Sequence, residues 1–576
     1  MGTETVKTKK QHQIGGWVIP AAIWWITVAI LLLVVVYPCV TLIMSSFKTA
    51  DGTYGLDNYI LVFTDEGILN SMLNTVKVVF TSTLTTTVIG VFLAWAVVRT
   101  DVPFKKTLEF LLSIPYFIPP FIGAVAWTFL LGPVGYVNQF LAGIMGVPRG
   151  PIDVYSIGGM IFVMSIYRYA VPFMVVVPTM RKISASLEEA ARMSGASPWR
   201  SLKDITLPLI TPSILGAALL TFMFILADFG VSAVLGSPDR IRLMTTQIYY
   251  LVTRTDIPNN QQLASAYSIF ISLFGLIGLY VYNKVLKTNK FVAVTGKSAP
   301  VEPTKLGPSR WVLFAFLVLF MLISTGAPII ATFLTSITKT WGLPLSGENV
   351  TLQNFVTMFG IQNVGQAFRN SCFLAITSAL IITVVTLIIG YMTVRPGVRG
   401  VKGIGFMQTM VTLPYAVPGT IIALAMILAF SQPIPGTKFT IYRTIWILLI
   451  AYVARFLQLG FNNITGAISQ IDPSLEEASR MSGATHFRSL KDITLPLLRN
   501  SLITSFLLVV APTLSEISLA GLLAGPKTQT LGTIVLSCQE EGRVLRTASM
   551  AILLMIFVIL LNSFIQWFSN RKGKDA

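Results

Sequence analysis

The chain has 576 residues, of which 54% are hydrophobic and only 11% are charged. Soluble domains carry about 25% charged residues, so this composition excludes a protein whose whole surface faces water. The net charge of +18 is spread over many short segments, which favours anionic lipid head groups as its neighbours and argues against a nucleic-acid partner. The class indicated is an all-α membrane protein.

Twelve apolar runs reach the roughly 20 residues that a helix needs to cross a bilayer. In chain order, the predicted spans are 17–46, 70–98, 108–131, 155–180, 209–235, 262–285, 310–336, 368–394, 404–430, 441–468, 497–524 and 547–568. They form two six-helix halves, 1–285 and 310–576, joined by a polar linker at 286–309. No small-residue cleavage site follows the first run, which we therefore interpret as a retained helix.

Loops that are rich in basic residues alternate along the chain with loops that are poor in them. One side carries Lys7, Lys9, Lys10, Arg99, Lys105, Lys106, Lys284, Lys287, Lys290, Lys297, Lys305, Arg310, Arg395, Arg399, Lys402, Arg571, Lys572 and Lys574. The loops of the other side are poorer in Lys and Arg. The positive-inside rule therefore predicts a multi-pass protein whose two termini and linker are cytoplasmic.

A polar segment between the fourth and fifth spans occurs twice. SLEEAARMSGASPWRSLKDITLPL at 186–209 returns as SLEEASRMSGATHFRSLKDITLPL at 474–497, with 20 of 24 positions identical and an offset of 288. Gene duplication alone predicts equal drift in loops and spans, yet the flanking spans have diverged far more. We infer that both loops, which the topology puts in the cytoplasm, contact the same surface on two copies of one partner.

Each copy predicts short surface helices. Ser186 with Glu189, and Ser474 with Glu477, have the spacing of a capping box. Gly195 and Gly483 suit helix C-caps, where a left-handed backbone is needed. Ser197–Pro198 and Thr485 are expected to begin a second short helix, and Leu207–Pro208 and Leu495–Pro496 to mark the turn into the next span.

The spacing of this segment resembles the EAA loop of importer-type ABC transporter permeases. The matching positions are Glu189, Ala190, Ala191, Gly195, Ile205, Leu207 and Pro208, and in the second copy Glu477, Ala478, Ser479, Gly483, Ile493, Leu495 and Pro496. The resemblance covers nearly the whole chain, because each half is similar to a six-helix type I importer permease domain. The second copy departs from the triplet by one serine.

The resemblance implies a mechanical role in the inner (plasma) membrane of a bacterium. In such permeases the loops couple to two copies of a cytoplasmic ATPase subunit, which binds ATP and Mg. An extracytoplasmic binding protein delivers the substrate, and this chain supplies the entire pore. The chain itself is expected to hold no cofactor, because its nearest match to a phosphate loop, Gly296-Lys297-Ser298, has Phe291 where the first glycine belongs. We find no catalytic residues and no site for a tightly bound metal.

Two acidic residues, Asp228 and Glu516, are also separated by 288 positions and fall in the predicted fifth span of each half. A carboxylate inside a membrane is costly, so it usually faces a cavity or a partner. Two interpretations stay open: the pair lines a pathway for a cation, or each pairs with a basic residue of the preceding span, Arg168 or Arg455.

The substrate class rests on resemblance. Fused chains with such fifth spans are similar to ferric-iron and thiamine permeases, and similar chains carry phosphonates or sugar phosphates. Two carboxylates favour ferric iron, whereas Arg168 and Arg455 suit an anion. A proton-coupled secondary transporter can also have twelve helices in two halves, but it needs no pair of matching loops.

Overall fold

The structure is a computed structural model that describes residues 21–183, 193–195, 197–288, 303–360, 363–395, 404–433 and 440–572. Its regular elements are helices. The first half contains α1 (Ala21–Leu31), α2 (Tyr37–Ser46), α3 (Asp57–Thr64), α4 (Glu66–Arg99), α5 (Lys105–Ser113), α6 (Pro120–Leu131), α7 (Tyr136–Met145), α8 (Ile157–Arg168), α9 (Ala170–Arg181), α11 (Pro198–Ser201), α12 (Leu207–Leu226), α13 (Gly230–Gly236), α14 (Met244–Thr253) and α15 (Asn260–Thr288).

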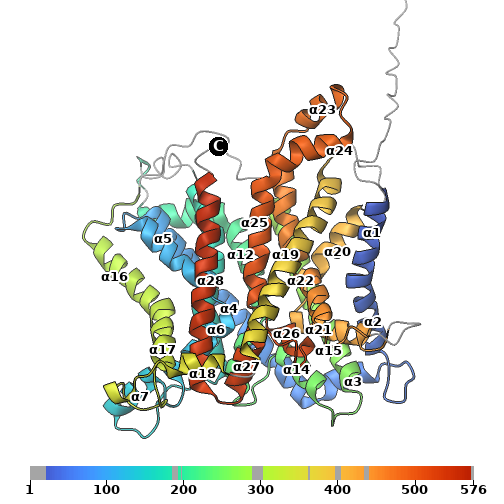
Figure 1. The fold of residues 1–576 in the computed structure, drawn as a ribbon. Coiled ribbons are helices and arrows are strands. Elements are labelled where there is room, and N and C mark those ends of the chain that lie inside the picture. The colour runs from blue at the N-terminus through green and yellow to red at the C-terminus, as the bar shows by residue number, and fades with distance from the viewer. Residues whose placement is uncertain are drawn as a thin grey trace, which may run out of the picture.

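The second half has a similar series, with the single helix α22 in the place of α8 and α9. It contains α16 (Ser309–Met321), α17 (Ala327–Ser336), α18 (Gln353–Phe359), α19 (Val364–Val394), α20 (Ile404–Ala416), α21 (Gly419–Phe430), α22 (Ile445–Gln470), α23 (Ser474–Met481), α24 (His486–Ser489), α25 (Leu495–Leu514), α26 (Ala520–Leu523), α27 (Leu531–Glu540) and α28 (Val544–Lys572). The long helices run side by side, with α23 and α24 at one end of the bundle and α7, α14, α18 and α27 at the other (Figure 1).

The predicted membrane spans are confirmed as helices, although some are broken. In the described residues, 11 helices are long and apolar enough to cross a membrane, and the bent pair α20–α21 raises the number to 12. That pair changes direction by 113° at Val417–Pro418, inside the run predicted as one span at 404–430. The corresponding run at 108–131 is likewise divided, into α5 and α6 by Phe117–Pro119. Proline has no N–H to donate to the preceding turn, so the helix stops or kinks there.

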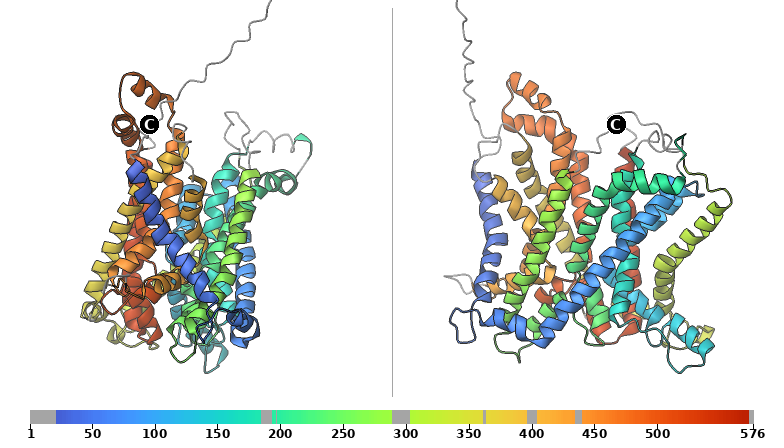
Figure 2. Two further views of the ribbon diagram at one scale, coloured as in Figure 1. Left: turned by 90° about the vertical axis from the view of Figure 1, so that its right-hand side faces the viewer. Right: turned by 180° about the vertical axis from the view of Figure 1, so that it is seen from behind.

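The two halves interlock through their first helices. Trp24, Leu31, Val34 and Val35 of the first span are buried in one cluster with second-half residues such as Ile422 and Met426. Conversely, Leu317 of α16 is buried among first-half residues of α4, α5 and α9. Figure 2 shows these first helices at opposite outer edges of the molecule, each beside helices of the other half. Each half therefore completes the core of the other.

Four prolines near helix starts follow a widened turn of helix. The residue before each proline donates its N–H to the carbonyl five positions back: Tyr37 to Leu32, Leu207 to Leu202, Ala327 to Leu322 and Leu495 to Leu490. Such π turns let a helix continue past a position that lacks a donor. The turn predicted at Leu207–Pro208 and Leu495–Pro496 is therefore wrong: the chain passes into α12 and α25 as a bent but unbroken helix.

Candidate functional site: two surface elbows and a central cavity

The second copy of the repeated segment forms an elbow, residues 472–496, at one end of the bundle (Figure 1). Helix α23 begins at Ser474, and the side chain of Asp472 accepts from the Ser474 N–H at 2.9 Å. This hydrogen bond lowers the pKa of Asp472 below its ordinary value. The capping box predicted for Ser474 and Glu477 is wrong, because Ser474 is the first residue of α23 and the N-cap position is held by Pro473, whose side chain cannot accept. The acceptor comes from Asp472 instead.

The predicted C-cap at Gly483 is confirmed. Gly483 has φ +85°, its N–H donates to the Arg480 carbonyl at 3.0 Å, and the N–H of Ala484 reaches back to Ser479 at 3.2 Å. Thr485 then caps α24, accepting from the Arg488 N–H at 3.2 Å. In the first copy, Gly195 has φ +82° and Ser197 accepts from the Arg200 N–H at 3.2 Å. Both copies therefore turn in the same left-handed way.

Burial follows the same pattern in both copies. Thr206 and Thr494 are buried; Ile205, Leu207, Ile493 and Leu495 are half-buried; Pro208 and Pro496 are exposed. Arg200–Asp204 and Arg488–Asp492 form matching ion pairs at 3.4 Å.

Glu477 and Ala478 are exposed and Ser479 is half-buried. Glu189, Ala190, Ala191 and Ser186 lie outside the described residues, so their predicted roles stay predictions.

The second feature is a cavity of about 360 Å³ between the two halves. Its lining combines apolar residues with Tyr116, Arg168, Tyr415, Arg455 and Glu516. The two tyrosines come from matching segments at the helix breaks, IPYFIP at 114–119 and LPYAVP at 413–418. This repeat is the signal by which sequence analysis could have found Tyr116 and Tyr415, which it missed.

Asp228 and Glu516 lie just past the ends of α12 and α25, not inside a continuous fifth span as predicted for 209–235 and 497–524. Asp228 accepts from the Val231 N–H at 2.9 Å, and Glu516 accepts from the Leu519 N–H at 3.0 Å. Each carboxylate therefore satisfies an otherwise unpaired N–H near the start of a short helix, α13 or α26. Position at a helix N-terminus also makes a negative charge less costly.

The two arginines have different partners. Arg168 pairs with Asp228 at 2.8 Å, as one of the two sequence interpretations proposed. Arg455 donates to the carbonyls of Val417 and Pro414, which lie at the break between α20 and α21. Across the described part of the chain no ion pair joins Arg455 to Glu516. The charge of Arg168 in the first half is therefore balanced by Asp228. In the second half, Arg455 and Glu516 both line the cavity as charged groups that are not paired with each other.

An aromatic bridge crosses the cavity between the halves. The guanidinium of Arg168 lies 5.7 Å from the ring centre of Phe224, whose ring lies 6.4 Å from that of Tyr415 on α20. Cation–π and edge-to-face contacts of this kind are favourable at these distances. Movement between the halves would separate these groups.

Next to this lining, the halves touch at Gly230. A Cβ at this position would lie 2.4 Å from the Cβ of Phe121 and 2.8 Å from the Cδ1 of Ile517. We expect Gly230→Val to destabilise the protein by about 1–3 kcal/mol through overpacking. The midpoint of thermal unfolding in detergent measures this. Gly143→Val on α7 is the control, because no neighbour in the described part of the chain lies within 4 Å of a Cβ there. An equal shift for both variants would contradict the contact.

Comparison with known proteins agrees with these features. The family described as "Binding-protein-dependent transport system inner membrane component" matches twice, over residues 86–287 and 396–574. A ferric transport system permease protein FbpB of Actinobacillus pleuropneumoniae is 26% identical over 92% of this chain and 76% of its own length. A putative ferric transport system permease protein FbpB 1 of Haemophilus influenzae is 27% identical over 82% of this chain and 73% of its own.

Among solved structures, a chain of a bacterial alginate ABC transporter aligns with 48% of this chain and 95% of its own length, at 22% identity and a TM-score of 0.39. The two matches of the family description cover more than half of the sequence, one in each six-helix half. The chain therefore belongs to the family of binding-protein-dependent transport system inner membrane components, the permeases of ABC importers.

Proposed function

We propose that this chain forms the whole translocation pathway of an ABC importer and couples to two identical ATPase subunits through its elbows. The observation that carries the proposal is the agreement between the two elbows, residues 184–208 and 472–496, at the positions that the structure describes. There the glycines have φ of +82° and +85°, the ion pairs match and the burial is the same. The ATPase belongs to a separate subunit, which binds ATP and Mg, and this chain performs no catalysis.

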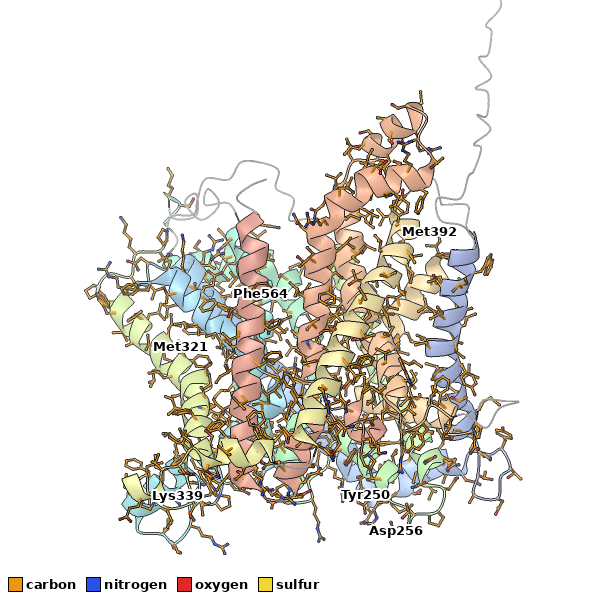
Figure 3. The ribbon with its side chains drawn as sticks, viewed as in Figure 1. Tyr250, Asp256, Met321, Lys339, Met392 and Phe564 are labelled. Carbon is orange, nitrogen blue, oxygen red and sulfur yellow. The ribbon has the colours of Figure 1, made fainter. Side chains whose placement is uncertain are left out.

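The elbows belong to the cytoplasmic side in this proposal. The ends of α4, α15 and α28 that carry Arg99, Lys284 and Lys572 lie at the elbow end of the bundle (Figure 2, right), and the positive-inside rule makes such an end cytoplasmic. Tyr250 and Asp256 lie at the opposite end, and Met392 of α19 near the elbow (Figure 3). That opposite end is where an extracytoplasmic binding protein would dock.

Ferric iron is the substrate that we favour. The relatives named above are ferric transport permeases by name, and the cavity offers Glu516 with two tyrosines. Ferric iron is a hard cation that suits oxygen ligands. It need only pass these groups, because the binding protein retains it before release.

An anionic substrate is the second candidate. Arg168 and Arg455 line the same cavity, and shorter matches include a probable sulfate permease of Anthoceros angustus and a molybdenum permease of Escherichia coli. Phosphonates and sugar phosphates belong to this class. Thiamine, a cation, would suit the carboxylates instead.

The purified cognate binding protein distinguishes these substrates. We expect it to retain ferric iron, and iron-loaded binding protein to stimulate ATP hydrolysis by the complex in vesicles. Stimulation by a sugar phosphate without any response to ferric iron would overturn the choice of substrate.

Dependence on ATP tests the machinery itself. We expect uptake to stop when the ATPase subunit is inactivated by mutation of its own nucleotide site, because the elbows then transmit no movement. Uptake that continues, driven by a proton gradient, would instead assign the chain to secondary transport.

A further inference from the structure

Four side chains meet under the second elbow where α19, α23 and the start of α25 come together. The Oε1 of Glu476 accepts from the Arg395 Nε at 3.0 Å and from the Thr494 hydroxyl at 2.7 Å. Its Oε2 accepts from the Tyr391 hydroxyl at 2.7 Å. Arg395 also donates through Nη1 to the Ile471 carbonyl at 3.1 Å. We refer to Tyr391, Arg395, Glu476 and Thr494 as the elbow tether.

The elbow tether is withdrawn from solvent although it lies at the end of the bundle. Glu476 is 8% exposed, Arg395 4%, Tyr391 2% and Thr494 0%. A buried ion pair is tolerated only where additional hydrogen bonds satisfy both charged groups. Here both carboxylate oxygens accept hydrogen bonds, from donors on α19, on the residue that follows it and on the π turn before α25. On the arginine side, Nε and Nη1 donate, whereas the buried Nη2 has no hydrogen-bond partner among the described residues.

The neighbouring residues of the same helix face outward. Glu477 is exposed, and so is Met481 at 89%; on the next short helix, α24, Phe487 is 62% exposed. Glu476 and Glu477 are therefore adjacent carboxylates with opposite surroundings: one is held by the membrane helices, and the other is free to meet a partner. A buried network with discrete geometry transmits displacement between the elements that it joins.

We propose that Glu476 is a positioning residue that makes the elbow move as one body with α19 and α25. When the ATPase subunit displaces α23, the hydrogen bonds of Glu476 displace Arg395 and Tyr391 at the end of α19. They also displace Thr494 in the turn that leads into α25. This inference rests on the proposed function, because it assigns a route for the force that the ATPase delivers. The exposed face of α23 contacts the ATPase subunit, and the buried face transmits the displacement to α19 and α25.

The first half offers the same residue types except for the tyrosine, because a tryptophan stands four positions before Arg99. In register, Glu188 corresponds to Glu476 and Thr206 to Thr494, and Arg99 likewise ends the second span of its half. Arg99 is 2% exposed and donates to the Met180 carbonyl at 2.8 Å, and Thr206 is 1% exposed. Glu188 lies outside the described residues, so its contribution is tested by mutation only.

The test compares Glu476→Gln with Glu477→Gln in the complete complex with its ATPase, reconstituted in vesicles. Glutamine replaces one acceptor oxygen of Glu476 by an NH₂ group, which cannot accept from the surrounding donors. We expect Glu476→Gln to keep the ATPase bound and hydrolysing, but to lower ferric-iron uptake per ATP about tenfold, within the usual range of coupling between sites. Glu477→Gln should instead lower the amount of ATPase that co-purifies.

Thr494→Val provides a milder variant that keeps the ion pair and removes one hydrogen bond. It should lower uptake per ATP by a smaller factor, about two- to fivefold. Normal uptake per ATP in both Glu476→Gln and Thr494→Val would overturn the role of the elbow tether. If the unmodified chain binds no ATPase, or takes up ferric iron without one, the proposed function fails, and this result is distinct from a failure of the tether.

Discussion

In Gly483→Pro, we expect ATP hydrolysis to continue while substrate uptake is nearly lost. Proline fixes φ near −65°, whereas Gly483 has φ +85° and donates its N–H to Arg480 at 3.0 Å. The cost of about 3 kcal/mol corresponds to about a hundredfold loss of the native elbow conformation. Uptake and phosphate release, measured on the same vesicles, report the two activities separately.

Gly483→Asn is the matched control, because asparagine adopts the left-handed conformation more readily than other residues with a side chain. It should transport at close to the normal rate. No atom of the described residues lies within 4 Å of a Cβ at this position, so neither variant should lower the unfolding midpoint of the membrane spans. Gly195, with φ +82°, should respond to proline in the same way. Normal substrate uptake in Gly195→Pro would contradict the proposal that the two elbows contact the ATPase subunits equivalently.

The double change Asp228→Asn with Glu516→Gln should block passage of a cation without disturbing the ATPase contact. Both amides still have an oxygen that can accept from Val231 or Leu519, so the starts of α13 and α26 keep their caps. What is lost is the negative charge, including the partner of Arg168. We expect ferric-iron uptake to fall about tenfold or more, since a few kcal/mol of charge stabilisation disappears.

The single variants separate the two roles. Glu516→Gln should account for most of the loss of uptake, because Glu516 lines the cavity without an arginine partner among the described residues. Asp228→Asn should act mainly on stability, because it leaves the half-buried Arg168 unpaired. The unfolding midpoint and the uptake rate distinguish the two effects. Normal iron uptake in the double variant would mean that both carboxylates are structural.

The helices themselves were predictable from sequence because long apolar runs have few other stable forms in a bilayer. Their interruptions were not. The run around Asp228 stays apolar through Ala227, Phe229 and Gly230, so composition gives no sign that the helix stops there. The break depends on a carboxylate that caps the next helix and on close packing at Gly230, which are tertiary contacts.

The candidate site was predictable in part for a similar reason. The repeat at an offset of 288 identified the elbows and the acidic pair, because duplication preserves register. The elbow tether escaped notice, since Arg395 and Glu476 are 81 residues apart and no periodic pattern links them. The capping box was misassigned because Asp472 and Ser474 are both good cap residues, and only the backbone path decides between them.

The different partners of Arg168 and Arg455 have a consequence for the charges that a substrate would meet in the cavity. Were the pore assembled from two copies of one shorter polypeptide, both walls would necessarily carry the same charges. Because both halves belong to one chain, the two cavity walls can carry different residues. In the first half Arg168 is paired with Asp228, whereas in the second half Arg455 and Glu516 form no ion pair with each other among the described residues. On the proposed pathway, a substrate ion would therefore meet unlike charges on one side of the cavity only.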